Sequence, residues 1–211
     1  MTVETHPLRA DAQRNLARIV ETAHDVFAEQ GIDAPLSVIA ERAGVGVGTI
    51  FRRFPSKDEL LVAVLLHRGE QLVAAVDEAR ESADAGAAFS RLLETAIAAQ
   101  IHDRCFCDAI GTDLLAREEL VTLFDAAHTG LASLLARAQA EGAIRADVTA
   151  EDLLFVVHGV AHAGLMLEDV APGAWRRHLG LALDGLRPEA ATQLPRRPIS
   201  RRQFLAARCG S

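Results

Sequence analysis

The fold of this chain is decided by residues 36–54, which read LSVIAERAGVGVGTIFRRF. Three positions in this stretch, Ala40, Gly44 and Ile50, carry the residue types that two short crossing helices require. Ala40 is small enough for the helices to touch, and Gly44 tolerates the positive φ angle of a tight turn. Ile50 supplies an apolar anchor that faces the first helix. We therefore predict a helix-turn-helix whose opposite face is free to enter a DNA major groove.

The residues on both sides extend this motif. Apolar side chains at helical spacing predict a preceding helix over about 10–30, which ends at Gly31. The second helix of the motif covers about 47–54 and is closed by Pro55, because the residue before a proline disfavours helical backbone. The motif therefore belongs to a bundle of three short helices.

Two capping boxes mark where later helices begin. Ser56 with Glu59 starts a long helix over about 57–80, and Thr149 with Asp152 starts another. The spacing of apolar residues predicts the remaining helices over 88–101, 106–116, 117–141, 149–167 and 173–186. We therefore expect an all-α chain of about nine helices.

The helix expected from Leu153 to Leu167 is apolar nearly all round, which is typical of a helix buried on every side. A single layer of helices would leave one side of this apolar helix exposed, so we expect a second subunit to cover that side. We expect a helix-turn-helix DNA-binding domain over residues 1–56 and a helical ligand-binding and dimerisation domain over 57–187. A basic tail over 188–211, rich in arginine and proline, is expected to be disordered.

Composition excludes several classes of protein. Half of the 211 residues are apolar and 24% are charged, so the chain is globular rather than disordered. No uncharged apolar run approaches the roughly 20 residues of a membrane span, and the first fifteen residues hold no apolar stretch. Three cysteines are too few for a disulfide framework. We expect a cytoplasmic protein that has no membrane partner.

Charge is distributed unevenly along the chain. Residues 1–60 carry 7 basic and 9 acidic side chains, residues 61–186 carry 9 and 19, and residues 187–211 carry 6 and 1. The corresponding net charges are −2, −10 and +5, which give −7 for the whole chain. An acidic pI near 5.6 argues against a non-specific nucleic-acid wrapper. Nevertheless, Val47–Lys57 contains three cations and no acid, so a local DNA contact surface is compatible with the sequence.

The stretch from Asn15 to Val64 resembles the DNA-binding domain of the TetR (tetracycline-repressor-like) family of bacterial regulators. The matching residues are Ile19, Val20, Phe27, Gly31, Ile39, Ala40, Ala43, Gly44, Val45, Gly48, Thr49, Ile50, Phe51, Phe54, Lys57 and Leu60. Later segments, Trp175–Leu179 and Leu183–Pro188, are similar to an actinobacterial subgroup of that family. The resemblance implies a homodimeric repressor that binds a pseudo-palindromic double-stranded DNA operator and is released by a small molecule.

The resemblance also implies roles for individual residues. Val47, Thr49 and Arg52 would lie at base edges, and arginine is suited to bidentate contact with guanine. Phe51 and Lys57 occupy positions that usually touch phosphate. Further DNA contacts are expected from Arg14, Arg18 and Arg53.

This sequence departs from the family pattern at two places in the recognition helix. Phe51 stands where the family usually has tyrosine, so a hydrogen bond to phosphate is lost. Gly46 and Gly48 replace serine and other residues that are more usual there, which loosens the start of the helix. We therefore expect modest operator affinity.

The larger domain is expected to hold the small-molecule site, and its net charge of −10 favours a neutral or cationic ligand. Its candidate residues are Phe106, Phe124, His128, His162 and Met166. We expect neither a metal nor a cofactor.

Two alternatives stay open. His158 and His162 stand four residues apart on one helix and, together with Cys105, would suit a helical metal sensor or enzyme. Buried polar groups at an interface or a pocket wall are the more common explanation of such a pair. The same fold would also serve a transcriptional activator, and the sequence does not decide the sign of regulation.

Overall fold

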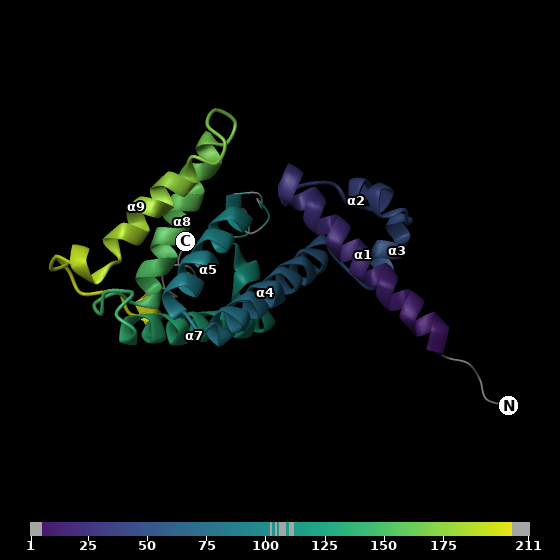
Figure 1. Cartoon of the computed structure of the whole chain (residues 1–211). Coiled ribbons are helices and arrows are strands. Elements are labelled where there is room, and N and C mark those ends of the chain that lie inside the picture. Colours follow the sequence, from purple (N-terminus) through teal and green to yellow (C-terminus); the bar gives the residue numbers. More distant parts are fainter. Residues whose placement is uncertain (1–5, 102, 104, 106–108, 110–111, 204–211) are drawn as a thin grey trace. The chain divides into compact units, whose positions relative to one another are not determined.

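The structure, a computed structural model, describes residues 6–101, 103, 105, 109 and 112–203. As predicted, every regular element among these residues is helical. The chain forms two compact units (Figure 1). The first contains the described residues up to Arg68 together with 103, 105 and 109, and the second contains the described residues from Gly69 to Ile101 and from 112 onward.

The first unit contains α1 (His6–Gln30), α2 (Leu36–Ala43), α3 (Val47–Arg53) and the start of α4 (Lys57–Glu81). α2 packs against both α1 and α3. The core of the first unit consists of apolar side chains from all four helices: Ile19, Ala23, Phe27, Ile39, Ala40, Ile50, Leu60 and Leu65. The motif residues Ala40 and Ile50 are thus buried where the two short helices meet, as predicted.

The turn between α2 and α3 has the predicted geometry. Gly44 adopts a left-handed conformation with φ of 65°, and its N–H donates to the carbonyl oxygens of Ala40 and Glu41. Gly31 ends α1 in the same way, with φ of 82°. Side chains with a Cβ rarely adopt this conformation, so both glycines fix the direction in which the chain leaves a helix.

The second unit is built around α5 (Ala85–Ile101), which packs against α7 (Glu118–Ala140), α8 (Ala150–Leu167) and α9 (Trp175–Gly185). Its core contains Phe89, Leu93, Ile97, Leu134, Leu153, Trp175 and Leu179. α8 begins with the predicted capping box. The Asp152 amide donates to Thr149 Oγ1 at 3.4 Å, and the Asp152 carboxylate accepts from the Thr149 amide at 2.9 Å.

The helix predicted over 106–116 differs from the structure in part of its described residues. Ala109 is helical, but Asp113–Ala116 form η1, a short 3₁₀ helix, between Thr112 and Arg117, whose backbone is extended. Residues 106–108, 110 and 111 lie outside the described residues.

The segment after η2 (Pro188–Ala190) covers the described part of the expected basic tail. Most of its described residues are exposed, but two of them bind the second unit. The Thr192 carbonyl oxygen accepts a hydrogen bond from Arg145, and Arg201 forms an ion pair with Asp125.

One helix of the described part, α8, is long and apolar enough to cross a membrane by length and composition alone. The core helices of soluble proteins pass the same test. α8 packs against α5, α7 and α9 and begins beside the buried carboxylate of Glu151, which is the arrangement of a helix within a helical bundle.

Candidate nucleic-acid interface

The helix α3 presents one face to the core of the first unit and the other to solvent. Ile50 is completely buried, whereas Val47 and Phe51 are 36% and 49% exposed. Arg52 and Arg53 are exposed as well. Since α3 has only seven residues, nearly all of its outward surface consists of the side chains that the sequence predicts to meet DNA.

Arg52 and Thr49 lie together on this surface. Arg52 Nη2 donates a hydrogen bond to Thr49 Oγ1 at 3.0 Å. A guanidinium has five N–H donors, so this bond orients the side chain and leaves other donors for a base edge. The pair thus forms a preoriented hydrogen-bonding group at the centre of the candidate interface.

The other cations predicted to contact DNA lie on α1 and α4 of the same unit. Lys57 is the first residue of α4, where the unpaired N–H groups of a helix N-terminus favour a phosphate. Its Nζ lies 5.9 Å from the centre of the Phe27 ring, so the ammonium group makes a cation–π contact with α1. Arg14 and Arg18 are both exposed on α1, and Arg18 donates to Asn15 Oδ1 at 2.7 Å.

One further arginine of the first unit is neutralised by a partner. Arg42 of α2 donates twice to the carboxylate of Glu29 on α1, at 2.6 and 3.1 Å. The hydrogen bond from Arg42 lowers the pKa of Glu29 and raises that of Arg42. This bidentate pair joins α1 to α2, the helix against which α3 packs. The charge of Arg42 is therefore balanced by Glu29 and does not add to the exposed cationic surface.

The two unusual glycines of α3 stand in open space. A Cβ atom added at Gly46 or Gly48 would meet no heavy atom within 4 Å. Gly46 is also the N-cap residue, and it has no side chain to accept the first helical N–H groups. The packing of the chain therefore does not require either glycine, and both reduce the intrinsic stability of the recognition helix.

A buried ionic cluster, which sequence reasoning missed, connects α1, α4 and the residues that follow α5. Asp103 is only 6% exposed. Its Oδ2 lies 3.0 Å from His24 Nε2 and 3.3 Å from Arg68 Nε, and its Oδ1 accepts from the Cys105 amide at 3.0 Å. His24 Nδ1 also lies 3.3 Å from the exposed Asp25 carboxylate. Every member of this cluster belongs to the first unit.

The pKa values in the cluster shift in opposite directions. The hydrogen bond to Asp103 raises the pKa of His24, and it outweighs the opposing effect of burial. Burial alone would raise the pKa of Asp103, but His24 and Arg68 together hold it below its usual value. The cluster is therefore most stable when His24 is protonated and Asp103 is ionised.

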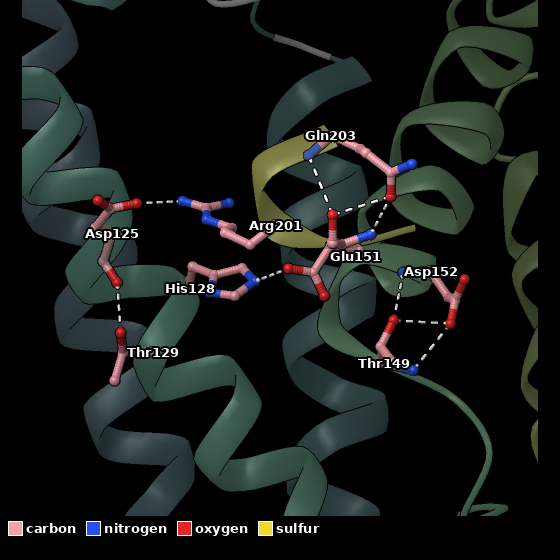
Figure 2. A network of polar contacts seen from close by, with 9 residues as sticks. Asp125, His128, Thr129, Thr149, Glu151, Asp152, Arg201 and Gln203 are labelled. Atoms are coloured by element: carbon pink, nitrogen blue, oxygen red, sulfur yellow. Dashed lines mark hydrogen bonds and ion pairs between the residues drawn. The ribbon is translucent and has the colours of Figure 1, made fainter. Parts of the chain in front are cut away.

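The structure does not bring the predicted small-molecule residues together. Phe124 and His128 are half-buried on α7, and His128 Nε2 lies 3.0 Å from Glu151 Oε1 at the start of α8 (Figure 2). Met166 is 74% exposed, and it stands fifteen positions after Glu151, which is about 22 Å along a helix. His162 is exposed as well, and Phe106 lies outside the described residues. Met166 and His162 therefore suit a surface contact better than the interior pocket that we expected.

The residues of the alternative metal site have other surroundings. His158 Nδ1 lies 2.8 Å from Gln100 Oε1, whereas His162 is exposed. Cys105 is buried in the first unit, while both histidines belong to the second. Within the described ranges, no three histidine, cysteine or acidic side chains gather as metal ligands.

An exposed apolar surface lies on α8, on the residues after it and on α9. Phe155, Met166 and Val170 are 57%, 74% and 83% exposed. Leu181 of α9 is 60% exposed. Gly159 of α8 is also exposed, and a Cβ added there would meet nothing within 4 Å. Large side chains exposed on neighbouring helices are typical of a surface that another protein covers.

Comparisons with known proteins match both units of the chain. Residues 19–64 match the family model described as bacterial regulatory proteins, tetR family. Residues 61–188, which are more than half of the chain, match the C-terminal domain described as transcriptional regulator SbtR-like. HTH-type transcriptional regulators of Staphylococcus aureus are 39% identical over 59 residues, and that match spans only 32% of their length and 28% of this chain.

Solved structures extend the similarity to most of the chain. A TetR regulator from Mycobacterium vanbaalenii is 35% identical, with a TM-score of 0.63 over 86% of this chain and 99% of that one. A TetR regulator from Streptomyces coelicolor is 28% identical, with a TM-score of 0.65 over 82% and 98%. FadR from Bacillus subtilis, solved with stearoyl-CoA, is 18% identical and shares the fold, with a TM-score of 0.63 over 81% and 99%. The protein is therefore a member of the TetR family of bacterial transcriptional regulators.

Proposed function

We propose that this chain is a cytoplasmic, homodimeric repressor that binds a pseudo-palindromic operator and is released from it by a small molecule. The observation that carries the proposal is the outward face of α3. There Arg52 is oriented by Thr49, while Ile50 fixes the helix from behind. In this proposal residues 1–56 read the operator, and residues 57–187 bind the effector and form the dimer.

Each DNA contact has a chemical reason. Arg52 donates to a guanine edge, and the methyl groups of Val47 and Thr49 suit the methyl group of thymine. Phe51 packs against the sugar-phosphate backbone without the hydrogen bond that tyrosine would give. The cations proposed to neutralise phosphates are Arg14, Arg18, Arg53 and Lys57.

Replacement of Arg52 by alanine is expected to weaken specific operator binding at least tenfold. One good arginine–guanine contact contributes roughly 1–3 kcal/mol of discrimination, and the proposed homodimer would lose two of them, one in each half-site. The operator is first selected from random double-stranded DNA, and binding is then measured by fluorescence anisotropy across a salt series. Arg91→Ala, which removes an exposed arginine of the second unit, serves as the control.

The two variants separate the outcomes of this experiment. Equal affinities of Arg52→Ala and Arg91→Ala for the selected operator would show that α3 does not read bases. Failure of the unaltered chain to select any sequence would overturn the repressor function itself. A steep loss of affinity with salt, with a slope of about −0.9 per neutralised phosphate, is expected for the unaltered chain.

We assign the dimer contact to the exposed apolar surface of α8 and α9. The residues that support this assignment are Phe155, His162, Met166 and Leu181, which are exposed in the single chain. Gly159 would let a second helix approach closely, because it adds no side chain to this surface.

Replacement of Met166 by glutamate is therefore expected to weaken dimerisation roughly 100-fold, since each protomer would bury one unpaired carboxylate. Sedimentation equilibrium measures the change directly. Val121→Glu places the same charge at an exposed valine of α7 and should leave the dimer intact. A dimer of Met166→Glu with unaltered affinity would refute the assignment of this surface.

The small molecule acts by binding more tightly to the arrangement that does not bind DNA. Phe124 and His128 of α7 are the described residues that we assign to its site. The net charge of −10 over residues 61–186 favours a neutral or cationic effector. FadR from Bacillus subtilis, which shares the fold, was solved with stearoyl-CoA, and this supports small-molecule binding as part of the proposal.

A further inference from the structure

The C-terminal segment has a firm attachment near its start. The guanidinium of Arg145, in the loop between α7 and α8, donates to the carbonyl oxygens of Thr192 at 2.5 Å and Gly185 at 3.3 Å. Arg145 is only 7% exposed and also donates to Asp147 at 2.6 Å. Because the donor is buried and has several protein acceptors, this attachment is costly to break.

The segment has a second attachment at the described residues 201–203, which are helical. A capping box forms this turn: the Gln203 amide donates to Ser200 Oγ at 3.3 Å, and Gln203 Oε1 accepts from the Ser200 amide at 2.9 Å. The turn directs Arg201 toward Asp125 of α7, with which it forms an ion pair (Figure 2). The side chains of Arg201 and Asp125 are 27% and 50% exposed, so water reaches this contact.

The second attachment lies beside a half-buried polar pair. Asp125 and His128 are three residues apart on α7, and His128 contacts Glu151 at 3.0 Å. The side chains of His128 and Glu151 are 17% and 10% exposed. Figure 2 draws the turn that carries Arg201 near His128 and Glu151, and its ion pair with Asp125 places it one helical turn from His128 on α7.

We propose that residues 191–203 form a strap that has a fixed end at Thr192 and a releasable end at Arg201, and that closes over the His128–Glu151 pair. The two ends differ in strength for a physical reason. The partly exposed ion pair of Arg201 shifts the equilibrium between the attached and the released segment by less than about fivefold, and salt screens it. The hydrogen bond from the buried Arg145 to Thr192 is little affected by water or salt.

The strap gives the basic tail a role within the molecule. The family match of the C-terminal domain ends at residue 188, so the strap lies beyond the matched region. Release of the strap uncovers His128. That this release opens the effector site to the small molecule rests on the function proposed above. The strap itself does not depend on DNA binding.

Hydrogen exchange of the full chain without DNA tests this proposal. Replacement of Arg201 by alanine should speed exchange of the Ser200 and Gln203 amides, which are hydrogen-bonded in this turn, and of the His128 ring C–H, by about two- to fivefold. Arg202→Ala removes the same charge from the exposed neighbouring position and should leave both rates unchanged. Circular dichroism confirms that the variants are folded.

Two further measurements identify the contact. Asp125→Asn should have the same effect as Arg201→Ala, and the double variant should exchange no faster than either single variant. Sodium chloride at 0.5 M should speed exchange in the unaltered chain but not in Arg201→Ala. Equal rates in Arg201→Ala and Arg202→Ala would overturn the strap, and an unchanged His128 rate would overturn its closure over the pair. Loss of operator binding alone would leave these rates unaffected, so the two proposals fail independently.

Discussion

Replacement of Asp103 by alanine is expected to lower the free energy of unfolding of the first unit by about 3 kcal/mol, since removal of one partner leaves the others in a buried cluster without a counter-charge. Asp103 is the only acidic group in contact with both His24 and Arg68 among the described contacts, and it also accepts from the Cys105 amide. Urea unfolding measures the loss of stability, and hydrogen exchange of the α1 amides locates it in the first unit.

A matched control separates this cluster from a surface effect. Asp25 also contacts His24, at 3.3 Å, but its side chain is 61% exposed. Asp25→Ala should therefore change the stability of α1 by less than about 0.5 kcal/mol. Similar losses for Asp25→Ala and Asp103→Ala would contradict the central position of Asp103.

The cluster also predicts how stability depends on pH. Because folding raises the pKa of His24, its contribution is fully present below the ordinary value of 6.5 and is lost as the pH rises through the folded value. The lowered pKa of Asp103 has the opposite sense: its contribution is present above 3.8 and is lost as the pH falls through the folded value. His24→Gln should therefore cost more stability at pH 6 than at pH 8, whereas a cost independent of pH would exclude an ionic role for His24.

Replacement of Gly164 by valine is expected to destabilise the second unit by about 3 kcal/mol. Three helices meet at this residue of α8, and an added Cβ would lie 2.8 Å from Ile101 Cδ1 and 2.9 Å from Trp175 Cβ. Ile101 Cδ1 is the end of a flexible side chain, but Trp175 Cβ is attached to the backbone of α9. Overpacking of this kind forces helices apart, which typically costs 1–3 kcal/mol.

Gly180, on α9, provides the control. A Cβ added there meets nothing within 4 Å, so Gly180→Ala should stabilise the chain by about 0.5–1 kcal/mol through helix propensity. Fluorescence of Trp175, the only tryptophan, reports the unfolding of the second unit for both variants. Equal effects of the two substitutions would contradict the close contact of α5, α8 and α9 at Gly164.

The sequence predicted the features that local rules determine. The period of an α-helix places Ile50 inward and Arg52 outward, and a glycine after the last apolar residue of a helix predicts the positive φ of Gly31 and Gly44. The capping box of Thr149 and Asp152 follows from side-chain reach over three residues. Each of these features depends on residues that are close together along the chain.

Features that depend on distant residues could not be predicted. His24 and Asp103 are 79 positions apart, and neither stands in a pattern that indicates a partner. The ion pair of Arg201 with Asp125 joins residues 76 positions apart, in a segment whose composition is typical of disorder. For Met166, an apolar side chain indicates burial but not by which surface, so an interior site and an exposed face of α8 were equally compatible with its sequence.

The two glycines at the start of α3 have a consequence for how an operator is recognised. A seven-residue helix with no side-chain N-cap has almost no stability of its own, so its shape is imposed by Ile50 behind it and by whatever lies in front of it. Such a helix can adjust its first turn to the local width of a DNA groove. Each time it binds, the first turn loses conformational entropy. We therefore expect this regulator to tolerate half-sites that differ in sequence, and to distinguish operators by how readily they accommodate the helix as well as by the bases that Arg52 contacts.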